Sequence, residues 1–306
     1  MQFDFSKIKY SLAPMAGYTD AAFRALCFEY GADYSVTEFV SAESVIRDNW
    51  KVEELTYIPN YSKPTGIQIF GSNPESMAKA ASILEKKAAV IDINMGCPAP
   101  KVTRNCGGAA LLENPEIAKS IIDSVISAVK TPVTVKMRLG VNSAEKSIEF
   151  AKMVESCGVR MLCVHGRTLK QGYTGTADWA KIREIKSSLS IPVFGNGDVK
   201  NYSDSVRFFE NTLCDGVSIG RGALGSPFVF QMLKKKEDFE PDFEMRKKAF
   251  FRYLELREKF SMRPSIGDIK GHALRFIQGI SHATDLRLNI SRAKTKEEIV
   301  EVFKEA

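Results

Sequence analysis

The chain contains 306 residues, a length that accommodates one large domain and a small second one and excludes a disulfide-stapled mini-protein. Its 44% hydrophobic and 26% charged residues are the proportions of a folded globular protein, which excludes a disordered chain. The net charge is +6, and residues 233–306 carry 17 Lys and Arg against 13 Asp and Glu. This basic tail is either a solvated helical surface or a patch for a polyanion.

Three sequence features bear on the cellular compartment. The first thirty residues include Asp4, Lys7, Lys9 and Asp20 and lack the apolar core of a signal peptide. Nowhere do about eighteen apolar residues follow one another, as a membrane-spanning helix requires. The six cysteines have no C-x-x-C spacing, which is untypical of a disulfide framework or a zinc site. We therefore expect a cytoplasmic protein with reduced thiols, no membrane contact and no metal.

The first three quarters of the chain alternate short apolar runs with amphipathic stretches. The runs predict eight strands at Leu12–Met15, Tyr34–Phe39, Gly66–Phe70, Val90–Asn94, Val133–Met137, Met161–His165, Pro192–Gly195 and Gly216–Ile219. The stretches between them predict helices at Ala21–Tyr30, Pro74–Lys86, Pro115–Val129, Ala144–Cys157, Trp179–Leu189 and Tyr202–Glu210. Eight such units in about 230 residues fit a closed (β/α)₈ TIM barrel better than the alternative, an open doubly wound sheet. The predicted fold class is therefore α/β.

The remainder of the chain has no strand pattern. Residues 237–244 are acidic and broken by Pro241, which is typical of a linker. Helical periodicity follows at Met245–Ser261, Ile266–Thr284 and Lys294–Lys304. We therefore expect a barrel domain over residues 1–236, a linker over 237–244 and a small all-helical domain over 245–306.

The predicted strands end in polar residues. Gln68, Lys136 and His165 each have an ordinary explanation as a core amide, a surface lysine and a core imidazole. In a TIM barrel, however, the carboxyl ends of all strands meet at one face, where the active site lies. Burying these groups together costs several kcal/mol unless they find partners, and a bound polar ligand provides them. We therefore infer a cofactor.

Two turns near the end of the barrel are typical of a phosphate site. Asn196-Gly197-Asp198 and Gly220-Arg221-Gly222 follow the last two strands and precede a short helix at Pro227–Lys235, where backbone N–H groups can face an anion. Residues 220–225 also satisfy G-x-G-x-x-G, but the motif follows the last strand, which argues against a dinucleotide fold. A mononucleotide cofactor with one phosphate is the better interpretation.

Cys97 is the candidate for catalysis. An arbitrary cysteine is usually an inert buried thiol, and the other five, Cys106 included, are interpreted as structural. Cys97 instead lies in a Gly-Cys-Pro turn at a strand exit, followed by glycines that permit loop movement. A thiol acid or nucleophile at the barrel mouth is therefore plausible.

Taken together, these motifs resemble the tRNA-dihydrouridine synthases, bacterial FMN-dependent enzymes that reduce selected uridines in tRNA. The resemblance covers the whole barrel and includes residues 13–24, Thr37-Glu38, 68–71, 92–98, Lys101-Val102, Gly108-Ala109, 135–138, 165–168, Gln171, Tyr173, 175–179, 195–198 and Gly220-Arg221. It implies an oxidoreductase that uses NADPH, with NADH possible. No feature points to an obligatory protein partner.

The resemblance also implies roles for individual residues. Cys97 corresponds to the general acid, which protonates carbon 5 of the uracil after reduced flavin has delivered a hydride to carbon 6, and Asn94 and Arg138 correspond to contacts with the flipped-out base. Residues that correspond to the FMN site are Pro14, Met15 and Ala16 beside the ring, Gln68 and Lys136 at its polar edge, and His165, Asn196, Gly197, Asp198, Gly220 and Arg221 at the ribityl phosphate.

The tail resembles the family's tRNA-binding domain more loosely. The matching positions imply phosphate contacts from Lys270, His272, Arg275 and Arg287. Two rival functions remain: an FMN-dependent reductase or dehydrogenase of a free pyrimidine or another small molecule, and a non-catalytic RNA-binding paralogue. The basic tail argues against the first, and the presence of Cys97, Lys136 and Arg221 argues against the second.

Overall fold

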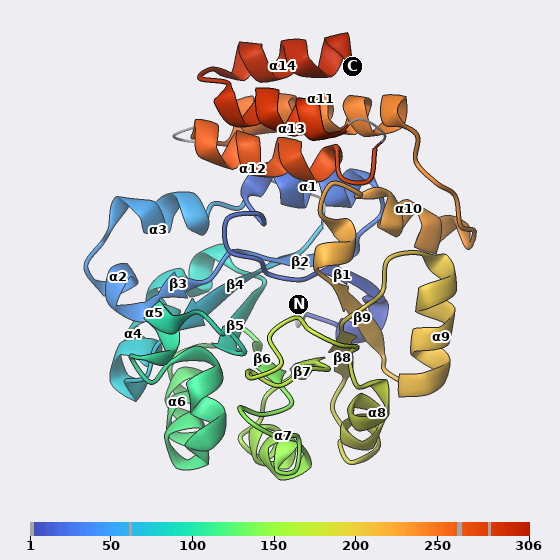
Figure 1. Cartoon of the computed structure of the whole chain (residues 1–306). Coiled ribbons are helices and arrows are strands. Elements are labelled where there is room, and N and C mark those ends of the chain that lie inside the picture. The colour runs from blue at the N-terminus through green and yellow to red at the C-terminus, as the bar shows by residue number, and fades with distance from the viewer. Residues whose placement is uncertain (1–2, 61–62, 262–264, 281–282) are drawn as a thin grey trace.

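Eight parallel strands close into a barrel. The computed structural model describes residues 3–60, 63–261, 265–280 and 283–306. Within this part, β2 pairs with both β1 and β4, and this pairing closes the sheet (Figure 1). The barrel strands are β1 (Tyr10–Leu12), β2 (Tyr34–Val36), β4 (Thr65–Phe70), β5 (Val90–Met95), β6 (Val133–Arg138), β7 (Met161–His165), β8 (Val193–Asn196) and β9 (Gly216–Ile219). The predicted TIM barrel is confirmed, and the alternative of an open doubly wound sheet is wrong.

Helices cover the outside of the barrel and continue beyond it (Figure 1). Their starts follow ordinary capping rules: Asn73 accepts from the Ser76 N–H at the start of α4, where Pro74 is the first residue. The barrel region contains α1 (Ala21–Glu29), α2 (Ala42–Ile46), α3 (Trp50–Leu55), α4 (Pro74–Leu84), α5 (Pro100–Thr103), α6 (Pro115–Ala128), α7 (Ser147–Ser156), α8 (Trp179–Ser187), α9 (Tyr202–Thr212) and α10 (Phe228–Lys235). The tail contains α11 (Phe243–Phe260), α12 (Ile266–Phe276), α13 (Ala283–Arg292) and α14 (Lys296–Glu305).

Two predicted strands differ from the structure. The strand expected at Leu12–Met15 is β1, which ends at Leu12, because Pro14 has no N–H and the Met15 N–H bonds to the Thr19 Oγ1 at 3.0 Å instead of to a neighbouring strand. The strand expected at Tyr34–Phe39 ends at Val36, and a separate short strand, β3 (Val40–Ser41), pairs with β4.

The prediction of one continuous helix over Ile266–Thr284 is wrong. In the structure α12 ends at Phe276, and Gly279 follows with a φ of +83°. This left-handed conformation ends a helix and favours glycine. A second helix, α13, begins at Ala283, and the interval includes residues 281–282, which lie outside the described residues.

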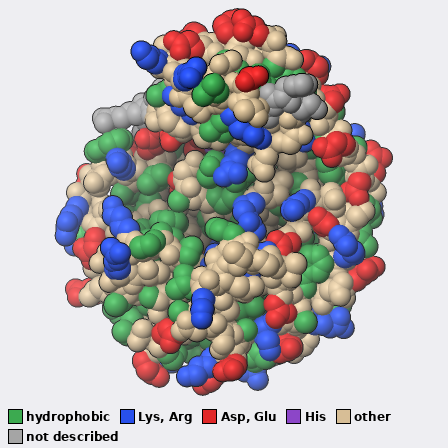
Figure 2. Space-filling view, in the orientation of Figure 1, with side chains coloured by type: hydrophobic (Ala, Val, Ile, Leu, Met, Phe, Trp, Pro, Cys, Tyr) green, Lys and Arg blue, Asp and Glu red, His purple; other side chains and the backbone are tan. Residues whose placement is uncertain are grey.

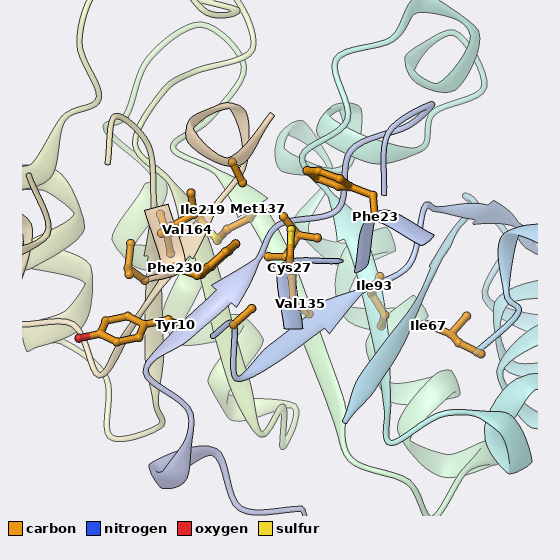
Figure 3. Packing of buried hydrophobic residues seen from close by; sticks show 14 of the residues in the cluster. Tyr10, Phe23, Cys27, Ile67, Ile93, Val135, Met137, Val164, Ile219 and Phe230 are labelled. Carbon is orange, nitrogen blue, oxygen red and sulfur yellow. The ribbon is translucent and has the colours of Figure 1, made fainter. Parts of the chain in front are cut away.

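Apolar side chains form two layers around the strands. One cluster fills the amino-terminal end of the barrel interior and includes Phe5, Tyr34, Met161 and Phe194. The larger cluster lies between strands and helices, and Figure 3 shows part of it. Each fully buried large side chain contributes roughly 1.5–3 kcal/mol to stability. Among the described residues, no helix combines the length and apolarity needed to cross a membrane.

The tail helices dock on the first barrel helix, and Figure 1 shows α11 and α12 beside α1. Asp20 caps α1 by accepting from the Phe23 N–H at 2.7 Å, and it also accepts from the Tyr253 hydroxyl at 2.9 Å and from Arg257. Arg257, which is 4% exposed, also bonds to the Asp268 Oδ2 at 2.8 Å. Barrel and tail are therefore joined by ion pairs from a buried guanidinium to two partly exposed carboxylates.

Candidate active site

The alternation of side chains along the strands creates a polar layer inside the barrel. On β5, Ile91 and Ile93 belong to the outer apolar cluster, so Asp92 and Asn94 point inward. On the neighbouring strands the same alternation directs further polar side chains into the barrel. These are Gln68, Thr134, Lys136, Arg138, His165, Asn196 and Ser218. The amino-terminal half of the barrel interior is thus apolar and the carboxyl-terminal half is polar.

Gln68 lies at the base of this polar layer and is fully buried. Its Nε2 donates to the Asp92 Oδ2 at 2.6 Å, and its Oε1 accepts from the Asn94 Nδ2 at 2.7 Å. Asp92 also accepts from the Thr134 hydroxyl at 2.5 Å. Burial raises the pKa of the Asp92 carboxyl, although both hydrogen bonds act in the opposite direction.

Cys97 lies directly after β5, where its backbone is held from two sides. The Cys97 N–H donates to the Asn94 Oδ1 at 2.8 Å, and the Cys97 carbonyl accepts from the Ala109 N–H at 3.1 Å. The side chain is 8% exposed, and burial raises the pKa of its thiol, although Arg138 and Lys136 act in the opposite direction. The thiol is therefore protonated at neutral pH, which suits an acid rather than a nucleophile.

Lys136 lies on β6, the strand next to this turn, where it is the register partner of Asn94. Its Nζ donates to the Asn196 Oδ1 at 3.1 Å, and the Asn196 Nδ2 donates to the Ser218 carbonyl at 2.6 Å. Burial lowers the pKa of the Lys136 ammonium. An ammonium has three donors, so this bond leaves donors for a ligand.

Cationic side chains surround His165, which is 6% exposed. Burial, together with Lys136, Arg138, Arg167 and Arg221, lowers the pKa of His165 to about 2. The imidazole is therefore neutral in this environment. In Figure 2, Lys and Arg side chains lie around a hollow in the middle of the face shown.

Asp198 is the carboxylate that pairs with these cations. It accepts from the Arg167 Nη2 at 2.9 and 2.7 Å and lies 3.6 Å from the Arg221 Nη2. Burial acts to raise the pKa of Asp198, but the bonds from Arg167 and the Ala177 N–H outweigh it, so the pKa is lowered. The Arg167 Nη1 is buried and has no hydrogen-bond partner among the described residues.

The exposed ring of Tyr173 lies above this cluster. Arg221 is 4.4 Å and Arg138 is 5.5 Å from the ring centroid. Arg138 is held below by bonds from its Nε to the Gly96 carbonyl and from its Nη1 to the Thr168 and Gly172 carbonyls. Cation–π contact with Tyr173 therefore helps to order both guanidinium groups.

The loop after β1 forms another wall. Pro14 and Met15 are partly buried and Ala16 is exposed, and a Cβ added to Gly220 would lie 3.5 Å from the Met15 Sδ. The Gly17 N–H donates to the Glu38 Oε2 at 2.5 Å, which fixes this loop against the segment between β2 and β3. Burial raises the pKa of Glu38 to about 7.

The barrel residues expected to form one site are thus brought together at the carboxyl ends of the strands. Gly197 is among them, and only glycine fits there, because its φ is +133° and an added Cβ would lie 2.6 Å from the Ala177 Cβ. The sequence motifs included Asp92, Arg167 and Tyr173 but assigned them no role. Their inward or strand-end position was the signal that could have singled them out.

The four tail residues lie on α12 and α13, outside the barrel interior, although Arg275 reaches Tyr18 in the loop after β1. Arg287 on α13 is exposed, the Lys270 Nζ donates to the Ser291 carbonyl at 2.8 Å, and Arg275 lies against the Tyr18 ring. His272 is 0% exposed, and its ring lies 4.2 Å from that of Tyr253. The predicted phosphate contact from His272 is therefore wrong, because its side chain belongs to the core between tail and barrel.

Comparisons with known proteins add independent information. A model of the family described as dihydrouridine synthase matches residues 11–306. The chain is 37% identical to a probable tRNA-dihydrouridine synthase of Aquifex aeolicus, over 99% of this chain and 97% of that protein. It is 36% identical to tRNA-dihydrouridine synthase B of Pasteurella multocida, over 88% and 83% of the two chains. A solved 2-naphthoyl-CoA reductase shares the fold alone, with a TM-score of 0.58 at 11% identity over 76% of this chain and 50% of that one.

Proposed function

The chain belongs to the dihydrouridine synthase family, and from this premise we propose that it reduces selected uridines in tRNA to 5,6-dihydrouridine, using bound FMN and NADPH. The observation that carries the proposal is the meeting of a protonated thiol, Cys97, with a cluster of cations at the mouth of one barrel, of which Arg138 and Arg167 are buried. A thiol acid serves proton transfer, and the surplus cations serve an anionic cofactor. We propose that the enzyme acts in the cytoplasm.

The residues present fit FMN. Lys136, Arg138, Arg167 and Arg221 surround His165, while Asp198 pairs with Arg167 and Arg221 and Asp92 acts on Lys136, so positive charge exceeds negative charge and a phosphate would offset it. The unpartnered Nη1 of Arg167 is a buried donor that such an anion can satisfy. When bound, FMN supplies the two-electron reduction of the uracil carbon 5–carbon 6 bond at the expense of NADPH.

We assign the FMN-holding residues by their place around the mouth. Pro14, Met15 and Ala16 would lie beside the ring, and Lys136 would donate to its polar edge together with the second Nε2 hydrogen of Gln68, whose first is bonded to Asp92. The phosphate end is assigned to residues from β7, β8 and β9 and the turns after them: His165, Asn196, Gly197, Asp198, Gly220 and Arg221.

Cys97 is the proposed acid for carbon 5 of the uracil. Its raised pKa keeps the proton on the Sγ at neutral pH, and its buried position excludes water from the transfer. A positioned acid of this kind contributes about 10²–10⁴-fold to the rate. Asn94 and Arg138, which flank the Cys97 turn, are the proposed contacts to the uracil edge.

The tail is proposed to hold the tRNA body while one base enters the barrel. A base stacked in folded RNA must be extruded before chemistry can reach it. Lys270, Arg275 and Arg287 lie on α12 and α13, and we assign them to phosphate contacts. We keep residues 1–236 as the catalytic unit, 237–244 as the linker and 245–306 as the tRNA-binding unit.

Substrate competition tests this proposal. The FMN-loaded protein is mixed with NADPH and either folded tRNA lacking dihydrouridine or free uridine, and dihydrouridine is measured. We expect the tRNA to be reduced far faster, and Cys97→Ala to lose turnover while it keeps FMN and tRNA affinity. Equal rates on tRNA and uridine would favour a small-molecule reductase. A protein that cannot be loaded with FMN would favour an RNA-binding paralogue. Replacing NADPH with NADH identifies the reductant.

A further inference from the structure

We propose that Asp92 is a positioning residue that orients a chain of two amides and thereby fixes the turn that carries Cys97. This inference rests on the proposed function for its catalytic consequence. Asp92 is 2% exposed and lies one inward position deeper in the barrel than Asn94. Its oxygens accept from the Thr134 hydroxyl at 2.5 Å and from the Gln68 Nε2 at 2.6 Å.

The chain of bonds has a direction that Asp92 sets. A carboxylate only accepts, so Gln68 must turn its Nε2 toward Asp92 and its Oε1 toward Asn94. Asn94 must then present its Nδ2 to that oxygen at 2.7 Å. This leaves the Asn94 Oδ1 facing the N–H groups of Gly96 and Cys97, at 3.1 and 2.8 Å.

Reversing the direction of these hydrogen bonds would disrupt the turn that carries Cys97. An Asn94 side chain rotated by half a turn would place its Nδ2 against the Cys97 N–H, donor against donor. A buried donor without an acceptor is unfavourable, so the turn would have to move. The Cys97 carbonyl is held separately by the Ala109 N–H at 3.1 Å, so the change would fall on the amide side of the turn and on the thiol.

Each member of the chain has a different task. Asn94 is a proposed contact to the uracil, and Cys97 is the proposed acid. Asp92 touches neither the thiol nor the barrel mouth and acts through Gln68 and Asn94. One carboxylate therefore sets the orientation of a substrate contact and the place of the proton donor together.

The test substitutes Asp92→Asn, which keeps the shape of the side chain but can present a donor as well as an acceptor to Gln68. The readout is the rate at which iodoacetamide alkylates each cysteine in the FMN-loaded protein, measured by mass spectrometry of peptides. We expect alkylation of Cys97 to change by about tenfold, the effect of one lost hydrogen bond. Alkylation of Cys106, which is exposed in the following loop, and of buried Cys163 should stay constant.

Two further variants make the result decisive. Thr134→Val removes one bond to Asp92 and should change Cys97 alkylation in the same direction by less, which provides a test if Asp92→Asn does not fold. Asp33→Asn is the matched control, because Asp33 also accepts hydrogen bonds but does so from the Lys9 and Tyr10 N–H groups outside the amide chain. It should leave Cys97 alkylation unchanged.

Turnover supplies the second readout. In Asp92→Asn we expect kcat for tRNA to fall about tenfold, with a smaller change in KM, because the tail surface is untouched while Asn94 and Cys97 are both displaced. If Asp92→Asn folds and both the alkylation rate of Cys97 and kcat are unchanged, the proposal is overturned. An alkylation rate that rises equally at Cys97 and at Cys163 would also overturn it, because it would indicate a general loss of packing. If the wild type makes no dihydrouridine, the proposed function fails, but the alkylation pattern still decides whether Asp92 positions Cys97.

Discussion

Two regions of this molecule bring cationic side chains together, and the two regions balance the positive charge differently. At the junction between barrel and tail, Arg257 bonds to Asp20 and Asp268, so two carboxylates meet one guanidinium. At the barrel mouth, Arg167 and Arg221 share Asp198, while Lys136 and Arg138 bond to neutral oxygens. At the junction the positive charge is fully paired within the chain, and the pairs join barrel and tail. The mouth carries surplus positive charge, which is the property of a site for an anion.

The first prediction tests the structural junction. Arg257→Met should lower the free energy of unfolding by about 1.5–3 kcal/mol, because the buried guanidinium loses its charged hydrogen bonds while the two carboxylates remain partly exposed. Arg252→Met is the matched control on the same helix, since Arg252 pairs with Glu29 at the exposed surface, where a pair contributes about 0–1 kcal/mol. Urea unfolding of both variants measures the difference, and equal losses would show that the junction is not special.

The second prediction tests the mouth. Arg221→Ala should weaken FMN binding by roughly 10–100-fold, because a charge-assisted hydrogen bond to phosphate is lost. Riboflavin, which lacks the phosphate, should bind to variant and wild type equally. Fluorescence titration measures both affinities. Without flavin, Arg221→Ala should keep the free energy of unfolding of the wild type, in contrast to Arg257→Met. If Arg221→Ala loses riboflavin affinity as much as FMN affinity, Arg221 does not contact the phosphate.

The third prediction concerns pH. The pKa of His165 is about 2, below the ordinary value near 6.5, so the folded chain binds this proton more weakly than the unfolded chain does. Its contribution to stability is therefore complete above about pH 6.5 and is lost as the pH falls, by up to about 2 kcal/mol at pH 5. Unfolding between pH 7 and pH 5 measures this loss, which saturating FMN should reduce and His165→Gln should remove.

His272 provides the control for this pH effect. Burial also lowers its pKa, to about 4, but it lies between tail and barrel rather than beside the surplus cations. His272→Phe should therefore weaken the pH dependence in the same window without changing how FMN affects it. If FMN acts equally in both histidine variants, the phosphate does not neutralise the environment of His165.

The smallest expected effect lies on the tail surface. Arg287→Ala should weaken tRNA binding modestly and make the logarithmic salt dependence shallower by about 0.7–0.9, the value for one phosphate contact. Binding measured at several salt concentrations gives this slope. Lys304→Ala, at the far end of α14 and paired with Glu301, is the matched control and should leave the slope unchanged. An unchanged slope in Arg287→Ala would remove that residue from the tRNA surface.

Local patterns predicted most of the barrel, because strand alternation and helix periodicity are properties of neighbouring residues. They also identified polar strand ends such as Gln68 and Lys136, which the barrel geometry brings to one face. These local patterns could not predict contacts between segments that are distant in the sequence. Arg257 meets Asp20 across 237 positions, and His272 is buried by that same docking, so its side chain could not be recognised as part of the core. The break after Phe276 depends on one glycine that a periodic pattern passes over.

The most direct test of uridine reduction uses a bacterial strain from which all of its own dihydrouridine synthase genes have been removed. The chain, or its Cys97→Ala variant, is expressed there, and dihydrouridine in purified tRNA is mapped by mass spectrometry. We expect the wild-type chain to restore dihydrouridine at defined positions and the variant to restore little or none. Absence of dihydrouridine with a folded, FMN-loaded wild-type chain would contradict the proposed function.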